Sequence, residues 1–291
     1  GTAGQTIVGR MGGAFVSPGK VAGVAVNGSK CWIKSGTYTI GSGTGNTSGN
    51  RVDTSLNSIA IRFEGYATTR GDRAAKPLFQ PSSGSISIFS GGPSAHYSQF
   101  ANLKVNGNGQ SSINAFSQGS TRSNIVDCEA VSCATGFNSS AIRCYAESCT
   151  TGFSVNTGCV ACVAKSCTTG FNAAGAAIFT GCIAYSGTTG FTGGAGQAFV
   201  AVNCTSYGNS GNGFTENQNG FRAINCLAVN NTGKGFASNA NDANTIYLTC
   251  AAYNNTGGTD RSPTALTADP FVAAASGNFA LNSTAGGGAA C

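Results

Sequence analysis

The sequence contains few charged residues, little proline and a single histidine. Charged residues make up 9% of the 291 positions, against roughly 25% in an average soluble domain. One histidine, His96, excludes metal sites built on two histidines. No apolar run reaches the roughly 18 residues that a membrane-spanning helix needs. Gly-x-Ser-x-Gly and Gly-x-x-x-x-Gly-Lys are both missing, so the sequence predicts neither a nucleophile elbow nor a phosphate-binding P-loop.

Glycine and cysteine are, by contrast, frequent. Glycine fills 44 of the 291 positions without a Gly-X-Y period, which excludes collagen. Glycine, serine, threonine and asparagine occur where a long helix would carry glutamate, lysine and leucine, so the composition predicts turn-rich β structure. The 13 cysteines are too sparse for a disulfide scaffold and odd in number, so at least one thiol has no partner within the chain.

Positive charge is concentrated in the first third of the chain. Residues 1–100 hold 9 Lys and Arg against 3 acids, whereas the other residues hold 7 of each kind. The basic residues are spread along the sequence rather than gathered in a motif. We therefore interpret them as solvated surface and expect no nucleic-acid partner.

A repeat governs the second half of the chain, where units such as IVDCEAVSCATGF and AINCLAVNNTGKGF recur. The first cysteine of each unit returns after 16 to 24 residues, and a Gly-Phe pair follows all but the last of them. These intervals are too short for βαβ modules, and the leucine pattern of leucine-rich repeats is missing. The repeated residues are Cys128, Cys144, Cys162, Cys182, Cys204, Cys226 and Cys250, with Phe137, Phe153, Phe171, Phe191, Phe214 and Phe236.

Alternation around each cysteine predicts a strand, as in Ile224, Cys226 and Ala228 on one face of the chain and Leu227 on the other. One strand, a turn, a second strand at Gly-Phe and a return segment complete one coil of a parallel β-helix. Coils stack about 4.8 Å apart, so equivalent residues form columns along the axis. The sequence therefore predicts buried columns of cysteine and phenylalanine.

A second column follows five residues after each of these cysteines and contains cysteine or asparagine, except at Gly187. We predict a structural turn column, in which asparagine side chains bond the backbone of the adjacent coil. Buried thiols are expected here, with a disulfide between Cys133 and Cys149 as the alternative. Cys159 and Cys162 are predicted to point to opposite faces, which argues against a zinc site. The column comprises Cys133, Cys149, Cys167, Asn209, Asn231 and Asn255.

The strand positions between the inward residues predict an outer face that is largely apolar or aromatic. A solvated sheet face would carry polar residues there. We expect this face to be buried against a second copy of the chain, which makes it an interface. The alternative is that a long loop or the C-terminal tail 259–291 folds over it. The predicted interface comprises Val163, Ile183, Tyr185, Tyr207, Leu227, Val229 and Tyr253.

Several stretches resemble the right-handed parallel β-helix, or pectate-lyase-like, superfamily. They are GSKCWIKSGTYTI at 28–40, IRFEGYATTRGD at 61–72, the Gly-Phe coils, and DPFVAAASGNFALNSTAGG at 269–287. The resemblance covers most of residues 20–290 and implies an all-β solenoid made of single-stranded coils. We expect an N-terminal cap with irregular coils at 1–100, regular coils at 101–258 and a C-terminal coil or tail at 259–291.

The resemblance implies one candidate catalytic cluster. Enzymes of this superfamily combine carboxylates with an Arg or Lys to act on acidic polysaccharides. Asp127 with Arg143, and Glu147 with Lys165, are opposite charges predicted on adjacent coils. Such pairs are equally typical of surface ion pairs. The candidates are Asp127, Glu129, Arg143, Glu147 and Lys165.

The superfamily hosts lyases, hydrolases, tail spikes and structural proteins, so the resemblance leaves the function open. The apolar outer face and the low charge favour a structural solenoid subunit of an extracellular fibre, a surface assembly or a virion appendage. A polysaccharide lyase or hydrolase, or a glycan-binding tail-spike-type protein, is the alternative. We expect copies of the same chain as partners, a polysaccharide as a further partner, and no cofactor or metal.

Overall fold

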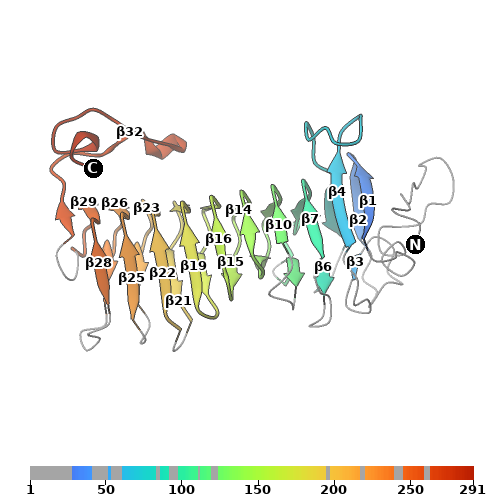
Figure 1. Ribbon diagram of the computed structural model, residues 1–291, viewed down its shortest axis with the longest axis horizontal. Helices are drawn as coiled ribbons and strands as arrows, with labels where there is room; N and C mark the ends of the chain where they lie inside the picture. The colour runs from blue at the N-terminus through green and yellow to red at the C-terminus, as the bar shows by residue number, and fades with distance from the viewer. Residues whose placement is uncertain are drawn as a thin grey trace. The chain divides into compact units, whose positions relative to one another are not determined.

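The computed structural model describes residues 28–40, 52–53, 61–82, 86–91, 98–110, 112–118, 124–194, 197–216, 220–238, 245–258 and 263–291. The chain divides into two compact units, Gly1–Ser154 and Val155–Cys291. In both units each coil contributes one short strand to each of three parallel sheets, here called A, B and C (Figure 1). The prediction of an all-β parallel β-helix is therefore confirmed. The described residues include no helix long and apolar enough to cross a membrane.

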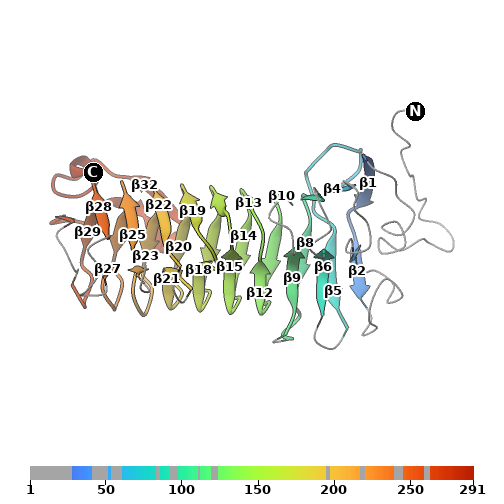
Figure 2. The same cartoon turned by 60° about the horizontal axis from the view of Figure 1, so that its bottom comes forward.

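The first unit contains the coils that precede the regular sequence repeat as well as its beginning (Figure 2). Sheet A consists of β1 (Ser29–Lys34), β4 (Ile61–Tyr66), β7 (Gln99–Ala101), β10 (Asn124–Val126) and β13 (Ala141–Ile142). Sheet B consists of β2 (Thr37–Ile40), β5 (Leu78–Pro81), β8 (Lys104–Asn106), β11 (Glu129–Val131) and β14 (Tyr145–Glu147). Sheet C consists of β3 (Val52–Asp53), β6 (Ser87–Gly91), β9 (Asn114–Gln118), β12 (Thr135–Phe137) and β15 (Thr151–Val155).

The second unit repeats this arrangement. Sheet A consists of β16 (Gly158–Val160), β19 (Ala177–Thr180), β22 (Phe199–Val202), β25 (Phe221–Ile224) and β28 (Ile246–Leu248). Sheet B consists of β17 (Val163–Lys165), β20 (Ile183–Tyr185), β23 (Thr205–Tyr207), β26 (Leu227–Val229), β29 (Ala251–Tyr253) and β30 (Thr264–Ala265). Sheet C consists of β18 (Thr169–Ala173), β21 (Thr189–Gly193), β24 (Phe214–Thr215) and β27 (Phe236–Ala237).

Cysteine and phenylalanine fill the interior of the coils. The seven column cysteines are at most 3% exposed, and the six column phenylalanines are fully buried. Phenylalanine rings stack in parallel from coil to coil, with centroids 4.8 Å apart for Phe137 and Phe153 and 4.7 Å apart for Phe171 and Phe191. All thirteen cysteines are thiols, of which only Cys291 is exposed. The interior is therefore a set of stacked apolar columns.

Residues upstream of the repeat form coils without its sequence pattern. Strand β1 pairs with β4 and β2 pairs with β5, both in parallel. Phe63, Phe79, Phe89 and Phe100 fill the interior there. A coil requires inward apolar side chains rather than a particular residue, so the cysteine spacing does not reveal these coils. The predicted boundaries at residues 100 and 258 stay predictions.

Tight corners with left-handed backbone join the sheets. Asp127 (φ 55°) and Arg143 (φ 51°) turn the chain between sheets A and B in the first unit, and Asn203 (φ 54°) and Asn225 (φ 51°) do so in the second. Asn and Asp tolerate this conformation because their short side chains bond the local backbone. Each corner projects its side chain away from the core, so charge can collect along the corner line.

The turn column lies just after the sheet B strands. In the second unit the Asn231 carboxamide oxygen accepts the backbone N–H of Asn209 (3.1 Å), and that of Asn255 accepts the N–H of Asn231 (3.0 Å). Side-chain amides continue the chain of bonds, as from Asn231 Nδ2 to Asn255 Oδ1 (2.9 Å). Cys133 and Cys149 occupy this column in the first unit and are buried. The asparagines therefore link adjacent coils through amide bonds, whereas the cysteines offer only weaker thiol bonds, as from Cys149 Sγ to the Ala130 carbonyl (3.7 Å).

The C-terminal tail forms an antiparallel hairpin of β31 (Phe271–Ala273) and β32 (Asn278–Leu281), with short 3₁₀ turns at Ala274–Ser276 and Gly288–Ala290. The Phe279 ring meets the edges of Tyr185 (5.2 Å) and Tyr207 (5.8 Å) on the outer face of sheet B. Val229 is completely buried beneath the hairpin. The cluster comprises Val229, Phe271 and Ala274, with Tyr207, Leu227, Tyr253 and Phe279 packed against it.

This packing answers the question of what covers the apolar face. The tail itself, given above as the alternative cover, lies on the stripe from Tyr185 to Tyr253. Val163 and Ile183 lie on the same face and are half-buried. A tethered segment occupies a surface at a high effective concentration, which a separate molecule must outcompete. The contact with a second copy was predicted from an exposed apolar face, and the tail covers part of that face. That contact stays a prediction.

Candidate functional site

A cluster of ionised side chains lies on the first unit, around the buried carboxylate of Glu64. Glu64 projects from the outer side of β4 and is 3% exposed. Its carboxylate forms ion pairs with Lys30 (2.8 Å), Arg62 (2.9 Å) and Arg73 (3.2 Å). Strand register explains two of these contacts, because Arg62 pairs with Lys30 on the neighbouring strand. A buried carboxylate needs such partners to stay charged.

Arg73 extends the cluster to the corner between sheets A and B. Its guanidinium contacts Asp127 (2.7 Å) as well as Glu64. Asp127 also accepts two bonds from Arg143, from Nε (2.8 Å) and from Nη2 (3.0 Å). This two-pronged geometry is the strongest form of an arginine–carboxylate pair. The predicted proximity of Asp127 and Arg143 is thus present as an ion pair between left-handed corner residues.

Glu129 anchors a second group of charges beside the first. Its carboxylate pairs with Lys76 and with Lys104 (3.1 Å). Lys104 lies on β8, the strand next to β11 in sheet B, and is the register partner of Glu129. Lys76, like Arg73, comes from the loop between β4 and β5. The loop therefore contributes a cation to each group.

Hydrogen bonds hold this loop in one conformation. The Asp72 carboxylate accepts the backbone N–H groups of Thr68 (2.9 Å) and Thr69 (2.7 Å), and also that of Ala67. These bonds hold the pKa of Asp72 well below its usual value. The buried Asn102 donates from Nδ2 to the carbonyl of Gly65 (3.0 Å) at the base of the loop. Arg73 and Lys76 are therefore presented on a braced loop.

All three acids of the cluster are held in the ionised form. Hydrogen bonds from Arg143 are the largest influence on Asp127 and lower its pKa. Burial works to raise the pKa of Glu129 and of Glu64, but the neighbouring cations outweigh it and leave both pKa values below the usual one. A general acid of a glycosidase needs the opposite shift. These carboxylates are suited to orienting cations rather than to donating protons.

Cations outnumber acids in the cluster by six to three, which leaves an excess of three positive charges. The Arg143 side chain is 56% exposed and that of Arg73 is 40% exposed, so both can reach a ligand. An aromatic pair adjoins the cations. Lys30 Nζ lies 3.6 Å from the Trp32 ring centroid, and Trp32 meets the edge of Tyr66 at 6.3 Å. We call this surface the charged face.

The structure brings together three of the five predicted catalytic candidates, Asp127, Glu129 and Arg143, on the charged face. Glu147 lies on β14 of the first unit, with Val131 as its register partner, whereas Lys165 belongs to the second unit. Their pairing stays a prediction. The repeat did not predict the other charged residues of this face, because they lie outside it. The only sequence signal is the excess of positive charge in the first third of the chain. These residues are Lys30, Arg62, Glu64, Arg73, Lys76 and Lys104.

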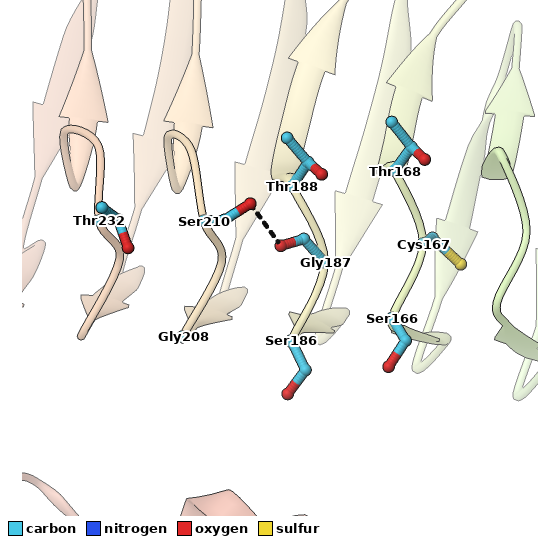
Figure 3. Close-up of a pocket in the computed structure, with 9 residues that line it drawn as sticks. All are labelled: Ser166, Cys167, Thr168, Ser186, Gly187, Thr188, Gly208, Ser210 and Thr232. Atoms are coloured by element: carbon cyan, nitrogen blue, oxygen red, sulfur yellow. Dashed lines mark hydrogen bonds between the residues drawn. The ribbon is translucent and has the colours of Figure 1, made fainter.

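The second unit carries a different feature, an uncharged groove of about 470 Å³ along the corner between sheets B and C. Figure 3 shows the hydroxyls of Ser166 and Ser186 on one side and those of Thr168 and Thr188 on the other. Gly187 lies between them and packs closely on the adjacent coil, where a Cβ would collide with the Cys167 carbonyl oxygen. Such a lining offers hydrogen bonds but no charge.

Within the part of the chain that the structure describes, no group of three or more His, Cys, Asp or Glu residues is placed to hold a metal ion. The three acids of the charged face are bound to cations instead. The prediction that Cys159 and Cys162 point to opposite faces is wrong: both are buried, because the left-handed corner at Ala161 (φ 52°) lies between them.

No family model matches the chain, and no curated protein does. Among solved structures, the Azotobacter vinelandii mannuronan C-5 epimerase AlgE4 A-module is similar with a TM-score of 0.55 and 13% identity, over 81% of this chain and 72% of that one. A rhamnogalacturonan lyase (TM-score 0.49, 16% identity, 81% and 68%) and pectate lyase Pel9A (0.45, 16%, 85% and 66%) are also similar. At these identities the likeness concerns the fold alone. The chain therefore shares the right-handed parallel β-helix fold of the epimerase module.

Proposed function

We propose that this protein binds an acidic polysaccharide through the charged face of its first unit. The observation that carries the proposal is the surplus of exposed cations over carboxylates. Arginine binds carboxylates with two parallel hydrogen bonds, and Arg143 already makes this contact with Asp127. A uronate of a polysaccharide offers the same group to the exposed guanidinium ions of Arg73 and Arg143.

The aromatic residues beside the cations support a sugar ligand. Trp32 and Tyr66 are half-buried on the outer face of sheet A, next to Lys30 and Arg62. An aromatic ring combines an apolar face for the C–H side of a sugar with a polar edge. On β1 the Trp32 ring lies between Lys30 and Lys34, and Tyr66 of β4 is the register partner of Lys34. The shared fold of a mannuronan epimerase is compatible with such a partner.

The carboxylates of the charged face favour binding of the polysaccharide without its cleavage. The three acids of the charged face have lowered pKa values, so a proton donor for glycoside hydrolysis is missing among them. A lyase acting through Arg143 is the alternative. It would release unsaturated products from polygalacturonate, which ultraviolet absorbance detects. We expect no such release.

The proposal is tested by titrating the full chain with polygalacturonate and with a neutral glucan. We expect binding to the acidic polymer only, weakening as salt is added, because exposed charges are screened. Arg143→Asn keeps a residue that tolerates the left-handed corner and removes the charge. It should weaken binding about tenfold, the loss of one charge-assisted contact.

Lys234→Gln, which removes a cation of the second unit, serves as the matched control and should leave the affinity unchanged. Equal binding of the neutral glucan, or an Arg143→Asn variant that binds as tightly as the parent, would refute the proposal. Circular dichroism of each variant excludes loss of fold as the cause.

A structural role is the second candidate, in which the chain is a self-associating subunit of a fibre, surface assembly or virion appendage. The apolar residues Val160 and Leu248, each about half exposed, favour it. Sedimentation of the full chain decides the matter, because large particles support the subunit role and monomers oppose it. Both roles suit an extracellular, cell-surface or virion location, which we propose for this protein.

A further inference from the structure

The outer face of sheet A in the second unit is apolar where a solvated sheet would be polar. Strand register places Ile178, Val200, Arg222 and Ile246 in one column across β19, β22, β25 and β28. Ile178 is 53% exposed and Ile246 is 39% exposed. A parallel column comprises Val160, Thr180, Val202, Ile224 and Leu248. The repeat predicted an apolar outer face only at positions that lie in sheet B.

A groove of about 410 Å³ opens beside the first of these columns. Its lining includes the outward residues Ile178 and Val200, together with Ala177 and Phe199, whose side chains are buried in the core. Arg222 is its one charged residue. The volume lies within the range of roughly 300–1,000 Å³ that small-molecule sites occupy. The groove is thus large enough for one short aliphatic chain.

Arg222 has no acidic partner among the residues that the structure describes. Its register neighbours are Val200 and Ile246, which are both apolar. The described acids of this unit, Glu216 and Asp269, form no ion pair with it. An exposed arginine at an apolar groove therefore offers an unused anion contact.

This charge also decides between possible occupants. If a second copy of the chain packed its own sheet A on this face, Arg222 would be buried against apolar columns without a carboxylate. Burial of an unpaired charge is costly, which disfavours that arrangement. An occupant must instead bring an apolar body and a negative group.

We propose that this groove binds a free single-chain amphiphile with an anionic head, of the fatty-carboxylate class. The alkyl chain lies against Ile178 and Val200, and the carboxylate accepts hydrogen bonds from Arg222. The site is on the second unit and is independent of the charged face, so either proposal can fail alone.

Calorimetric titration of the full chain with decanoate and with decanol tests the proposal. We expect one decanoate to bind per chain, and decanol to bind about tenfold more weakly, because it lacks the charge that Arg222 recognises. Arg222→Gln should weaken decanoate binding about tenfold and leave decanol binding unchanged. A loss of affinity for decanoate without a loss for decanol is expected only if the head group contacts Arg222.

A second variant tests the position of the groove. Ala198→Glu places a negative charge at an exposed lining residue and should abolish decanoate binding, while circular dichroism and the melting temperature stay as in the parent. Lys234→Gln, away from the groove lining, is the control and should bind normally. Equal affinity of decanoate for the parent and Arg222→Gln, or binding only to vesicles of anionic lipid, would overturn the proposal.

Discussion

The two units have the same interior and different outer faces. Both stack cysteine and phenylalanine in columns within three parallel sheets. Outside, the first unit carries the ion-pair network of Glu64 and Asp127, whereas the second exposes Ile178 and Leu248. The interior is constrained because each inward residue must fit its neighbours in the adjacent coils. Outward positions escape this constraint, so binding properties can differ between units that share a core.

The turn column makes the same point on a smaller scale. Asn209 and Asn231 in the second unit exchange hydrogen bonds with adjacent coils, while Cys133 and Cys149 in the first unit fill the same position by packing. Both residue types fit because each is small. They differ in what their removal leaves behind.

The largest effect should come from alkaline pH, which tests whether the two interiors respond alike. Burial raises the pKa of Cys31 and, in the second unit, of Cys226 to about 12, from a usual value of 9.0. Below about pH 9 both folded and unfolded thiols keep their protons. Between about 9 and about 12 only the folded state keeps them, so each thiol lowers the free energy of unfolding by about 1.4 kcal/mol per pH unit.

Urea unfolding under reducing conditions, at about pH 8 and about pH 11, measures this loss. Cys31→Ala and Cys226→Ala should each make the pH dependence shallower, one variant for each unit. A free energy of unfolding that stays constant up to about pH 11 would show that the columns are accessible to water.

Truncation of the phenylalanine column should be the next largest effect and equal in the two units. Phe137 stacks between Phe116 (5.0 Å) and Phe153 (4.8 Å), and Phe171 stacks on Phe191 (4.7 Å). Each Phe→Ala change should lower the free energy of unfolding by about 3–5 kcal/mol through lost burial and a cavity. Denaturant unfolding measures both. Thr192→Ala on the outer face, the control, should change it by less than about 0.5 kcal/mol; a near-zero effect at Phe137 would mean that the column is not the core.

The smallest difference concerns the turn column, where the units should diverge. Asn231→Ala removes the acceptor of the Asn209 N–H and should lower the free energy of unfolding by about 2–3 kcal/mol, because a buried donor is left without a partner. Cys133→Ala removes only a weak thiol bond to the Val131 carbonyl, which still accepts the Gly107 N–H, and should lower it by only about 1 kcal/mol. Unfolding of the two variants side by side provides the test. Equal losses would mean that the asparagine bonds add nothing beyond packing.

Sequence reasoning reached the coils because their inward residues repeat. Cys226 and Phe236 are buried as predicted. The single strand predicted around Cys226 is wrong, however, because the left-handed corner at Asn225 divides it into β25 and β26 and turns Ile224 to the outer face.

Sequence reasoning did not reach Glu64, because its partner Lys30 belongs to the preceding coil and Arg73 to an irregular loop, and neither follows the repeat. The repeat predicted the apolar outer face of sheet B. It did not predict that the hairpin at Phe279 packs on this face, because that contact joins segments far apart in the sequence.

The amino-acid order alone determined the solenoid, since a periodic placement of small and aromatic side chains can be buried in only one way, coil upon coil. Only the folded molecule decided which outward residues meet. Contacts on the outside depend on coil length, corner direction and the path of the tail, which place Arg73 beside Asp127 and Phe279 over Tyr185. Short-range pattern thus sets the core, and long-range geometry sets the surfaces that bind.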